Sequence, residues 1–172
     1  MRGERGGSGR RARTRARDLA GPAGPGGGDV SDGPLSRPTD RLVIHHSASP
    51  TSTTLEQIDR WHRDRGFDGI GYHHLIRADG RVLPGRDLSR PGAHAAGHNA
   101  HSIAICVAGD NTRPEHAWTA AQKQALVVYV RWFRIFFPSA AVVGHRDLPG
   151  AATTCPGVDV RELLREPGAT GE

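Results

Sequence analysis

The chain has 172 residues, of which 36% are hydrophobic, which is enough for one domain with a modest core. Its formal charge of +5 is concentrated in residues 1–17, which hold seven of the 23 basic and one of the 18 acidic residues, so that the remainder carries 16 basic and 17 acidic side chains. We therefore expect no nucleic-acid partner for the folded part. No apolar run approaches the ~20 residues of a membrane helix, so we expect no integral membrane segment.

Residues 1–40 are rich in Arg, Gly and Pro and include the run GPAGPGGG. Such a composition buries too little apolar surface to offset the entropy lost on ordering, so we predict a disordered arm. The arm is either a solvated tail or an electrostatic tether to an acidic surface. No apolar segment follows its arginines, so no secretory signal is visible, and we expect cytoplasmic synthesis unless translation starts elsewhere. We expect the domain to span 41–166, with a short tail at 167–172.

The first elements of the domain are a strand and a helix. The apolar run RLVIHH at 41–46 predicts a buried strand. Residues 53–66 predict an amphipathic helix, because their apolar side chains recur at helical spacing. Thr53 followed by Glu56 predicts a capping box at its start.

Two further strand regions follow. Residues 73–85 predict two short strands around the Asp79–Gly80 turn. The continuous apolar run at 102–109 predicts a central strand, because a strand that is buried on both faces has little polar alternation.

The last elements complete an alternating pattern. Residues 119–137 predict the longest helix, capped by Thr119 and Gln122. A last strand is expected at 141–144 and a closing helix at 159–163. Strands that alternate with helices indicate an α/β fold, here a single domain with a central mixed β-sheet flanked by helices.

Several aromatic, histidine and cysteine side chains have a purely structural interpretation. Helical spacing alone explains Trp61, Trp132 and Phe133, which we expect in the core. His62 is expected at the surface of its helix. Cys106 lies in a predicted buried strand and is expected to act as a small hydrophobe rather than as a disulfide partner.

Imidazole and thiol side chains gather at the ends of two predicted strands. His45 and His46 end the strand at 41–46, and because successive strand residues face opposite ways, one of them can point to a site. His145 follows another strand, and Cys155 lies on the turn-rich loop after it. Two imidazoles with a thiolate favour Zn²⁺ over Mg²⁺ or Ca²⁺. Three protein ligands leave a fourth position for water, which is typical of a catalytic rather than a structural zinc.

Four blocks carry a resemblance to a known family. In chain order they are VIHHSAS, LEQIDRWHRDRGFDGIGYHHLIRADGRVLPGRD, GAHAAGHNAHSIAICVAG and GHRDLPGAATTCPGVD. They resemble the type 2 N-acetylmuramoyl-L-alanine amidase and peptidoglycan-recognition-protein superfamily, in particular the short phage amidases often called phage lysozymes. The resemblance spans about residues 41–165. It implies a zinc hydrolase that cuts the amide between the lactyl group of N-acetylmuramic acid and the L-alanine of the stem peptide in peptidoglycan.

The resemblance also implies roles for particular residues. It assigns the zinc ligands to His45, His145 and Cys155, with His46 facing away. It assigns the catalytic tyrosine to Tyr72, in the GYH block.

Four further residues belong to the same blocks. His94 resembles a histidine of the substrate cleft, whereas Asn99 and Ser102 match a motif for which we expect a structural role. Thr153 stands where the phage enzymes often carry lysine, although animal recognition proteins that retain zinc commonly have threonine there. A hydroxyl would offer the oxyanion a neutral hydrogen bond, roughly half as strong as one from a charged donor.

Alternative interpretations remain at this stage. The principal rival is a non-catalytic peptidoglycan-binding module of the same fold, although such members tend to lack the cysteine or the tyrosine. A purely structural zinc site would require a fourth protein ligand. Nucleic-acid binding would have to involve the basic residues of the arm, within the first 40 residues. We expect a monomer that acts on the cell wall, of phage or bacterial origin, or a secreted enzyme if the start is misassigned.

Overall fold

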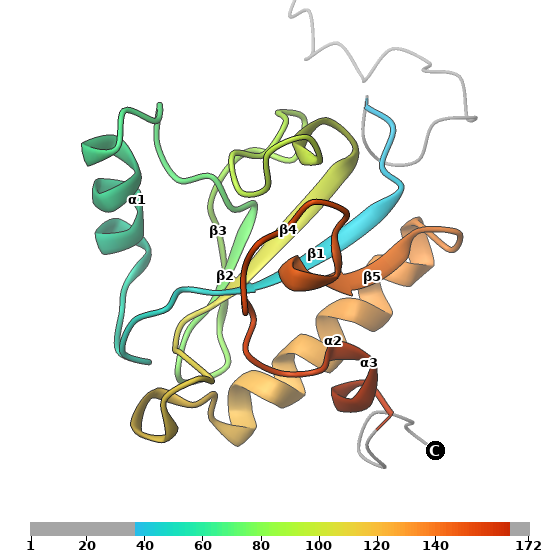
Figure 1. Cartoon of the computed structure of the whole chain (residues 1–172). Helices are drawn as coiled ribbons and strands as arrows, with labels where there is room; N and C mark the ends of the chain where they lie inside the picture. The colour runs from blue at the N-terminus through green and yellow to red at the C-terminus, as the bar shows by residue number, and fades with distance from the viewer. Residues whose placement is uncertain (1–36, 166–172) are drawn as a thin grey trace, which may run out of the picture. The chain divides into compact units, whose positions relative to one another are not determined.

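Five strands form one mixed sheet in the order β3-β2-β4-β1-β5 (Figure 1). The computed structural model describes residues 37–165. Neighbouring pairs among β2, β4, β1 and β5 are parallel, and only β3 pairs antiparallel, with β2. The strands are β1 (Arg41–His46), β2 (His74–Ile76), β3 (Val82–Pro84), β4 (Ser102–Val107) and β5 (Ala141–Gly144). This arrangement confirms the predicted mixed sheet and the central position of the strand that begins at Ser102.

Helices cover both faces of the sheet. The helices are α1 (Leu55–Asp64), α2 (Ala120–Phe136) and α3 (Val160–Leu163), with short 3₁₀ turns η1 (Asn99–His101), η2 (Pro114–His116) and η3 (His145–Asp147). The long helix α2 runs across one face, with α3 on the same side, and α1 lies on the opposite side (Figure 1). The single α/β domain predicted from the alternating pattern is therefore confirmed.

Alternation along β1 decides which side chains meet which helices. Leu42 and Ile44 pack with α2 and α3 in the main core, whereas Val43 belongs to a separate cluster with Ala95 and Leu148. His45 is next on the Val43 side, because side chains alternate along a strand. The strand thus sends one face of its side chains into the core and the other toward the loops at the carboxyl edge of the sheet.

The helix caps follow the predictions with one correction. Thr119 and Gln122 form the predicted capping box of α2. The capping box of α1 consists of Thr54 and Gln57, whereas Thr53 with Glu56 was predicted, so the prediction was wrong by one residue. Thr53 is buried and its hydroxyl donates a hydrogen bond to Ser49, 2.9 Å away, whereas the hydroxyl of Thr54 accepts from the N–H of Gln57 at 3.3 Å.

Three predictions about burial needed revision. Phe133 is fully buried, as expected, but Trp61 and Trp132 are 38% and 39% exposed. His62 was expected at the surface but is buried, and its Nδ1 accepts a hydrogen bond from the backbone N–H of Gly71 at 2.8 Å. Cys106 is fully buried and its thiol is free, as the small-hydrophobe interpretation predicted.

The predicted disordered arm and the tail at 167–172 lie almost entirely outside the described residues. Arg37 is described, and its guanidinium donates hydrogen bonds to the backbone carbonyls of Leu88, Ala100 and Ser102. Ordered contacts therefore reach at least four residues ahead of the start of β1. Among residues 37–165, no helix combines the length and the apolar character needed to cross a bilayer.

Candidate metal centre

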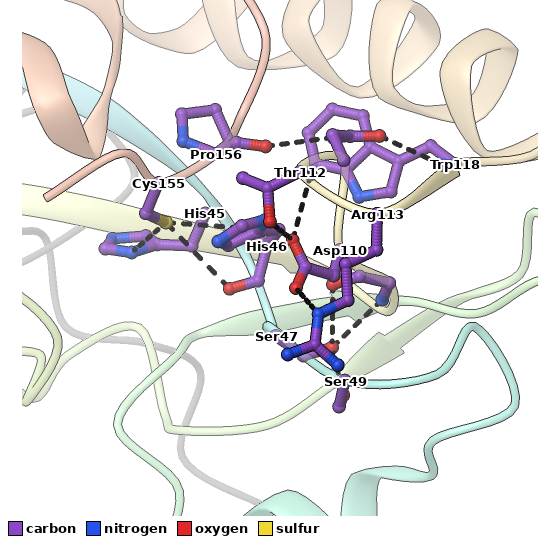
Figure 2. A network of polar contacts seen from close by, with 12 residues as sticks. His45, His46, Ser47, Ser49, Asp110, Thr112, Arg113, Trp118, Cys155 and Pro156 are labelled. Carbon is purple, nitrogen blue, oxygen red and sulfur yellow. Dashed lines mark hydrogen bonds and ion pairs between the residues drawn. The ribbon is translucent and has the colours of Figure 1, made fainter. Parts of the chain in front are cut away.

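Parallel pairing of β1 with β5 brings the three predicted ligands together. Ile44 pairs with Gly144, so His45 and His145 leave the sheet side by side, with ring centroids 4.6 Å apart. Cys155 returns to the same place from the loop after β5, and its Sγ lies 3.7 Å from His45 Nδ1 (Figure 2). One ligand atom from each of the three residues lies within 4.8 Å of the other two. The spacing is close enough for one ion to be shared by all three.

Backbone hydrogen bonds hold the cysteine loop in place. The N–H of Cys155 donates to Thr153 Oγ1 at 3.1 Å, and its carbonyl accepts from the N–H of Arg146 at 2.7 Å. The Asn111 side chain donates to the carbonyl of Pro156 at 2.9 Å. The sulfur itself accepts from the N–H of His46 at 3.4 Å. The position of the thiol is therefore set by the surrounding chain.

Burial determines the protonation of these groups in the absence of a cation. It lowers the pKa of His45 well below its usual value, with smaller contributions from His94 and His145, and it lowers the pKa of His145 as well. It raises the pKa of the Cys155 thiol to about 11. The site therefore offers two neutral imidazoles and a thiol that a nearby cation would help to ionise. This donor set fits Zn²⁺, which binds imidazole nitrogen and thiolate sulfur readily.

His46 faces away from the ligands, as strand alternation predicts. Its Nδ1 lies 3.4 Å from a carboxylate oxygen of Asp110 (Figure 2). Hydrogen bonds from Thr112 are the largest cause of the lowered pKa of Asp110, so the carboxylate is ionised near neutral pH. Sequence reasoning did not find this acidic partner, because nothing in the spacing connects the loop after β4 with the end of β1.

Tyr72 lies beside the ligand cluster. Its ring centroid is 5.1 Å from that of His45 and 5.3 Å from that of His62. Burial raises the pKa of the Tyr72 phenol well above its usual value. A phenol that stays protonated near neutral pH can donate a hydrogen bond beside the ligand cluster.

The remaining two predicted residues lie next to different members of the cluster. His94 Nδ1 is 3.0 Å from His45 Nε2, on the side away from Cys155. Thr153 and His145 line a pocket of about 190 Å³ between the loops at 95–98 and 148–153. The structure thus brings all six predicted residues into one neighbourhood, and their individual roles stay predictions.

A larger pocket than this one lies elsewhere. A cavity of about 600 Å³ is formed by the Asp79–Gly80 turn and the outer face of α2, where Trp132 is part of the wall. None of the six predicted site residues lines it. The candidate site is therefore identified by the type of side chains that converge there and not by the size of its pocket.

Comparisons with known proteins identify the family to which the chain is similar. The family model described as N-acetylmuramoyl-L-alanine amidase matches residues 35–158, which include all six residues. The endolysin of Klebsiella phage KP32 is 32% identical over 128 residues, covering 72% of this chain and 83% of the relative.

Solved structures lead to the same family. The Ph2119 endolysin of a Thermus scotoductus bacteriophage superimposes with a TM-score of 0.69 at 31% identity, over 77% of this chain and 86% of that one. A complex of tracheal cytotoxin with the ectodomains of peptidoglycan recognition proteins LCa and LCx gives a TM-score of 0.65 at 29% identity, over 77% and 84%. The chain therefore belongs to the N-acetylmuramoyl-L-alanine amidase family, which the four sequence blocks had indicated.

Proposed function

We propose that this protein is a zinc-dependent N-acetylmuramoyl-L-alanine amidase that cuts the bond between N-acetylmuramic acid and L-alanine in peptidoglycan. The observation that carries the proposal is the convergence of His45, His145 and Cys155 within 4.8 Å, beside the phenol of Tyr72. His45 and Cys155 are buried and His145 is partly exposed, so the cluster has one side open to a substrate.

The protein's own groups would orient the substrate and stabilise charge. Bound zinc supplies a Lewis acid and makes water nucleophilic near neutral pH. Tyr72 is proposed to donate a hydrogen bond to the developing oxyanion. The Thr153 oxygen accepts a hydrogen bond from the N–H of Cys155, which leaves its hydroxyl proton free to serve as a second donor.

A second function is a peptidoglycan-binding module without turnover. It is favoured by the structural neighbour that was solved with tracheal cytotoxin. The enzyme is the better-supported proposal, because this chain retains a thiol in the ligand cluster and a tyrosine beside it. Either function places the protein on the cell wall.

Digestion of purified peptidoglycan tests the bond specificity. We expect mass spectrometry to find free stem peptides that begin with L-alanine, together with intact glycan strands. Cys155→Ser should release none and should not retain zinc, because one of three ligands is gone. Cys106→Ala is the matched control: it removes the other buried thiol and should keep both zinc and activity. Normal release by Cys155→Ser would contradict the ligand assignment, and binding without any release by the unmodified chain would favour the recognition module.

Replacing Tyr72 by Phe tests the proposed donor. Loss of one donor to an oxyanion typically slows turnover about 100-fold, so Tyr72→Phe should lose activity to about this extent and keep its zinc. Tyr129→Phe serves as the control, because the Tyr129 hydroxyl forms a hydrogen bond with His74 between α2 and β2 and is not part of the candidate site. Steady-state kinetics with a soluble muropeptide measures both. Unchanged turnover in Tyr72→Phe would exclude the phenol from the reaction.

The affinity for zinc should rise with pH. Burial raises the pKa of Cys155 to about 11 and lowers those of His45 and His145, so at neutral pH only the thiol has a proton to lose on binding. Release of one proton predicts roughly a tenfold gain in affinity per pH unit between about pH 7 and 9. Competition with a chromophoric chelator measures this slope. A pH-independent affinity would mean that no thiol proton is displaced.

A further inference from the structure

The two ring nitrogens of His45 face different partners. Nδ1 lies 3.7 Å from Cys155 Sγ, on the side of the ligand cluster, and Nε2 lies 3.0 Å from Nδ1 of His94. The rings of His45 and His94 meet edge to face, with an interplanar angle of 81°. His94 therefore contacts His45 on the side away from the sulfur.

A serine hydroxyl and a backbone carbonyl fix the direction of these hydrogen bonds. Ser102 Oγ lies 2.7 Å from the carbonyl oxygen of His98, and in that pair only the hydroxyl can donate. Its single proton is then committed, so Ser102 Oγ accepts from Nε2–H of His94, 3.1 Å away. A neutral imidazole carries one ring proton, so His94 Nδ1 is left as an acceptor. It accepts from Nε2–H of His45, which leaves the lone pair of His45 Nδ1 on the side of Cys155.

The local chain leaves the His94 ring little freedom. The side-chain oxygen of Asn99 accepts hydrogen bonds from the N–H groups of His94 and Ala95, at 2.9 and 3.0 Å. A Cβ on residue 92 would lie 2.3 Å from Cδ2 of the His94 ring, so Gly92 provides the space that the ring occupies. Ser102 is fully buried at the start of β4. Between residues 37 and 165, no comparable hydrogen bond orients the ring of His145.

We propose that His94 and Ser102 act as a positioning relay that holds His45 in its Nε2–H tautomer and directs Nδ1 to the metal. A hydrogen bond to the second nitrogen of a histidine commonly sets which nitrogen binds a metal. In this view His94 acts through His45. Both of its ring nitrogens are already engaged inside the protein, so the relay differs from the substrate contact that the sequence predicted. The inference rests on the proposed function only for the identity of the ion.

Zinc affinity and tautomer state test the relay together. Loss of such a partner typically weakens metal binding 10- to 100-fold, and we expect this for His94→Ala. His94→Asn should recover much of the affinity, because its side-chain oxygen can take the place of Nδ1 as acceptor. His101→Ala is the control for loss of an exposed histidine and should bind zinc as the unmodified chain does. Nitrogen NMR of the metal-free protein should find His45 protonated at Nε2, and a mixture of tautomers in His94→Ala.

The results separate the relay from its rivals. A His94→Ala variant that binds zinc normally and shows only a higher KM would overturn the relay in favour of a substrate contact. An unchanged His45 tautomer in that variant would overturn it too. The tautomer of His45 is measured in the metal-free protein. If the His94→Ala variant shows the expected mixture of tautomers but the unmodified protein binds no zinc, the relay is supported and the proposed function is contradicted.

Discussion

Parallel pairing between β1 and β5 is the constraint on which the site depends. The register that aligns Ile44 with Gly144 places the next residue of each strand, His45 and His145, at the same edge of the sheet. Parallel strands carry their carboxyl ends to one edge, so a loop that leaves that edge can return a third candidate ligand to it. Cys155 does so, and hydrogen bonds from Arg146 and Asn111 to its carbonyl and that of Pro156 fix the return. The strand pairing of the fold and the loop after β5 therefore together place the three candidate ligands.

The packing of the helices explains why only one histidine of the pair at the end of β1 faces His145 and Cys155. Leu42 and Ile44 are turned into the core against α2 and α3, and His46 follows the same side, toward Asp110. His45 is turned to the opposite side, where its ring is enclosed by His94, His145 and Tyr72. Burial that would be costly for a charged imidazole is tolerable for a neutral one that has a hydrogen-bond partner. The same burial keeps the thiol protonated until a cation is present.

Much of the fold could be predicted from the sequence, because the strands are nearly continuous apolar runs and the long helix carries a capping box at Thr119. The cap of α1 could not be placed to the residue, since Thr53 and Thr54 offer the same hydroxyl and only the buried contact to Ser49 distinguishes them. Trp61 and Trp132 have the helical spacing of core residues, but their side chains are partly exposed. Residue types and strand ends suggested the ligands, and the family resemblance chose between His45 and His46. The links from Ser102 through His94 to His45 depend on side-chain direction, which no spacing encodes.

The central claim is that one metal ion is bound by two imidazoles and a single sulfur. X-ray absorption at the zinc edge of the reduced, metal-loaded protein measures this shell directly. We expect one sulfur at about 2.3 Å and two imidazole nitrogens at about 2.0 Å, with one light atom completing the coordination. A shell without sulfur would remove Cys155 from the site, and a shell with two sulfurs would require Cys106 to leave its buried position in β4. Either result would contradict the account.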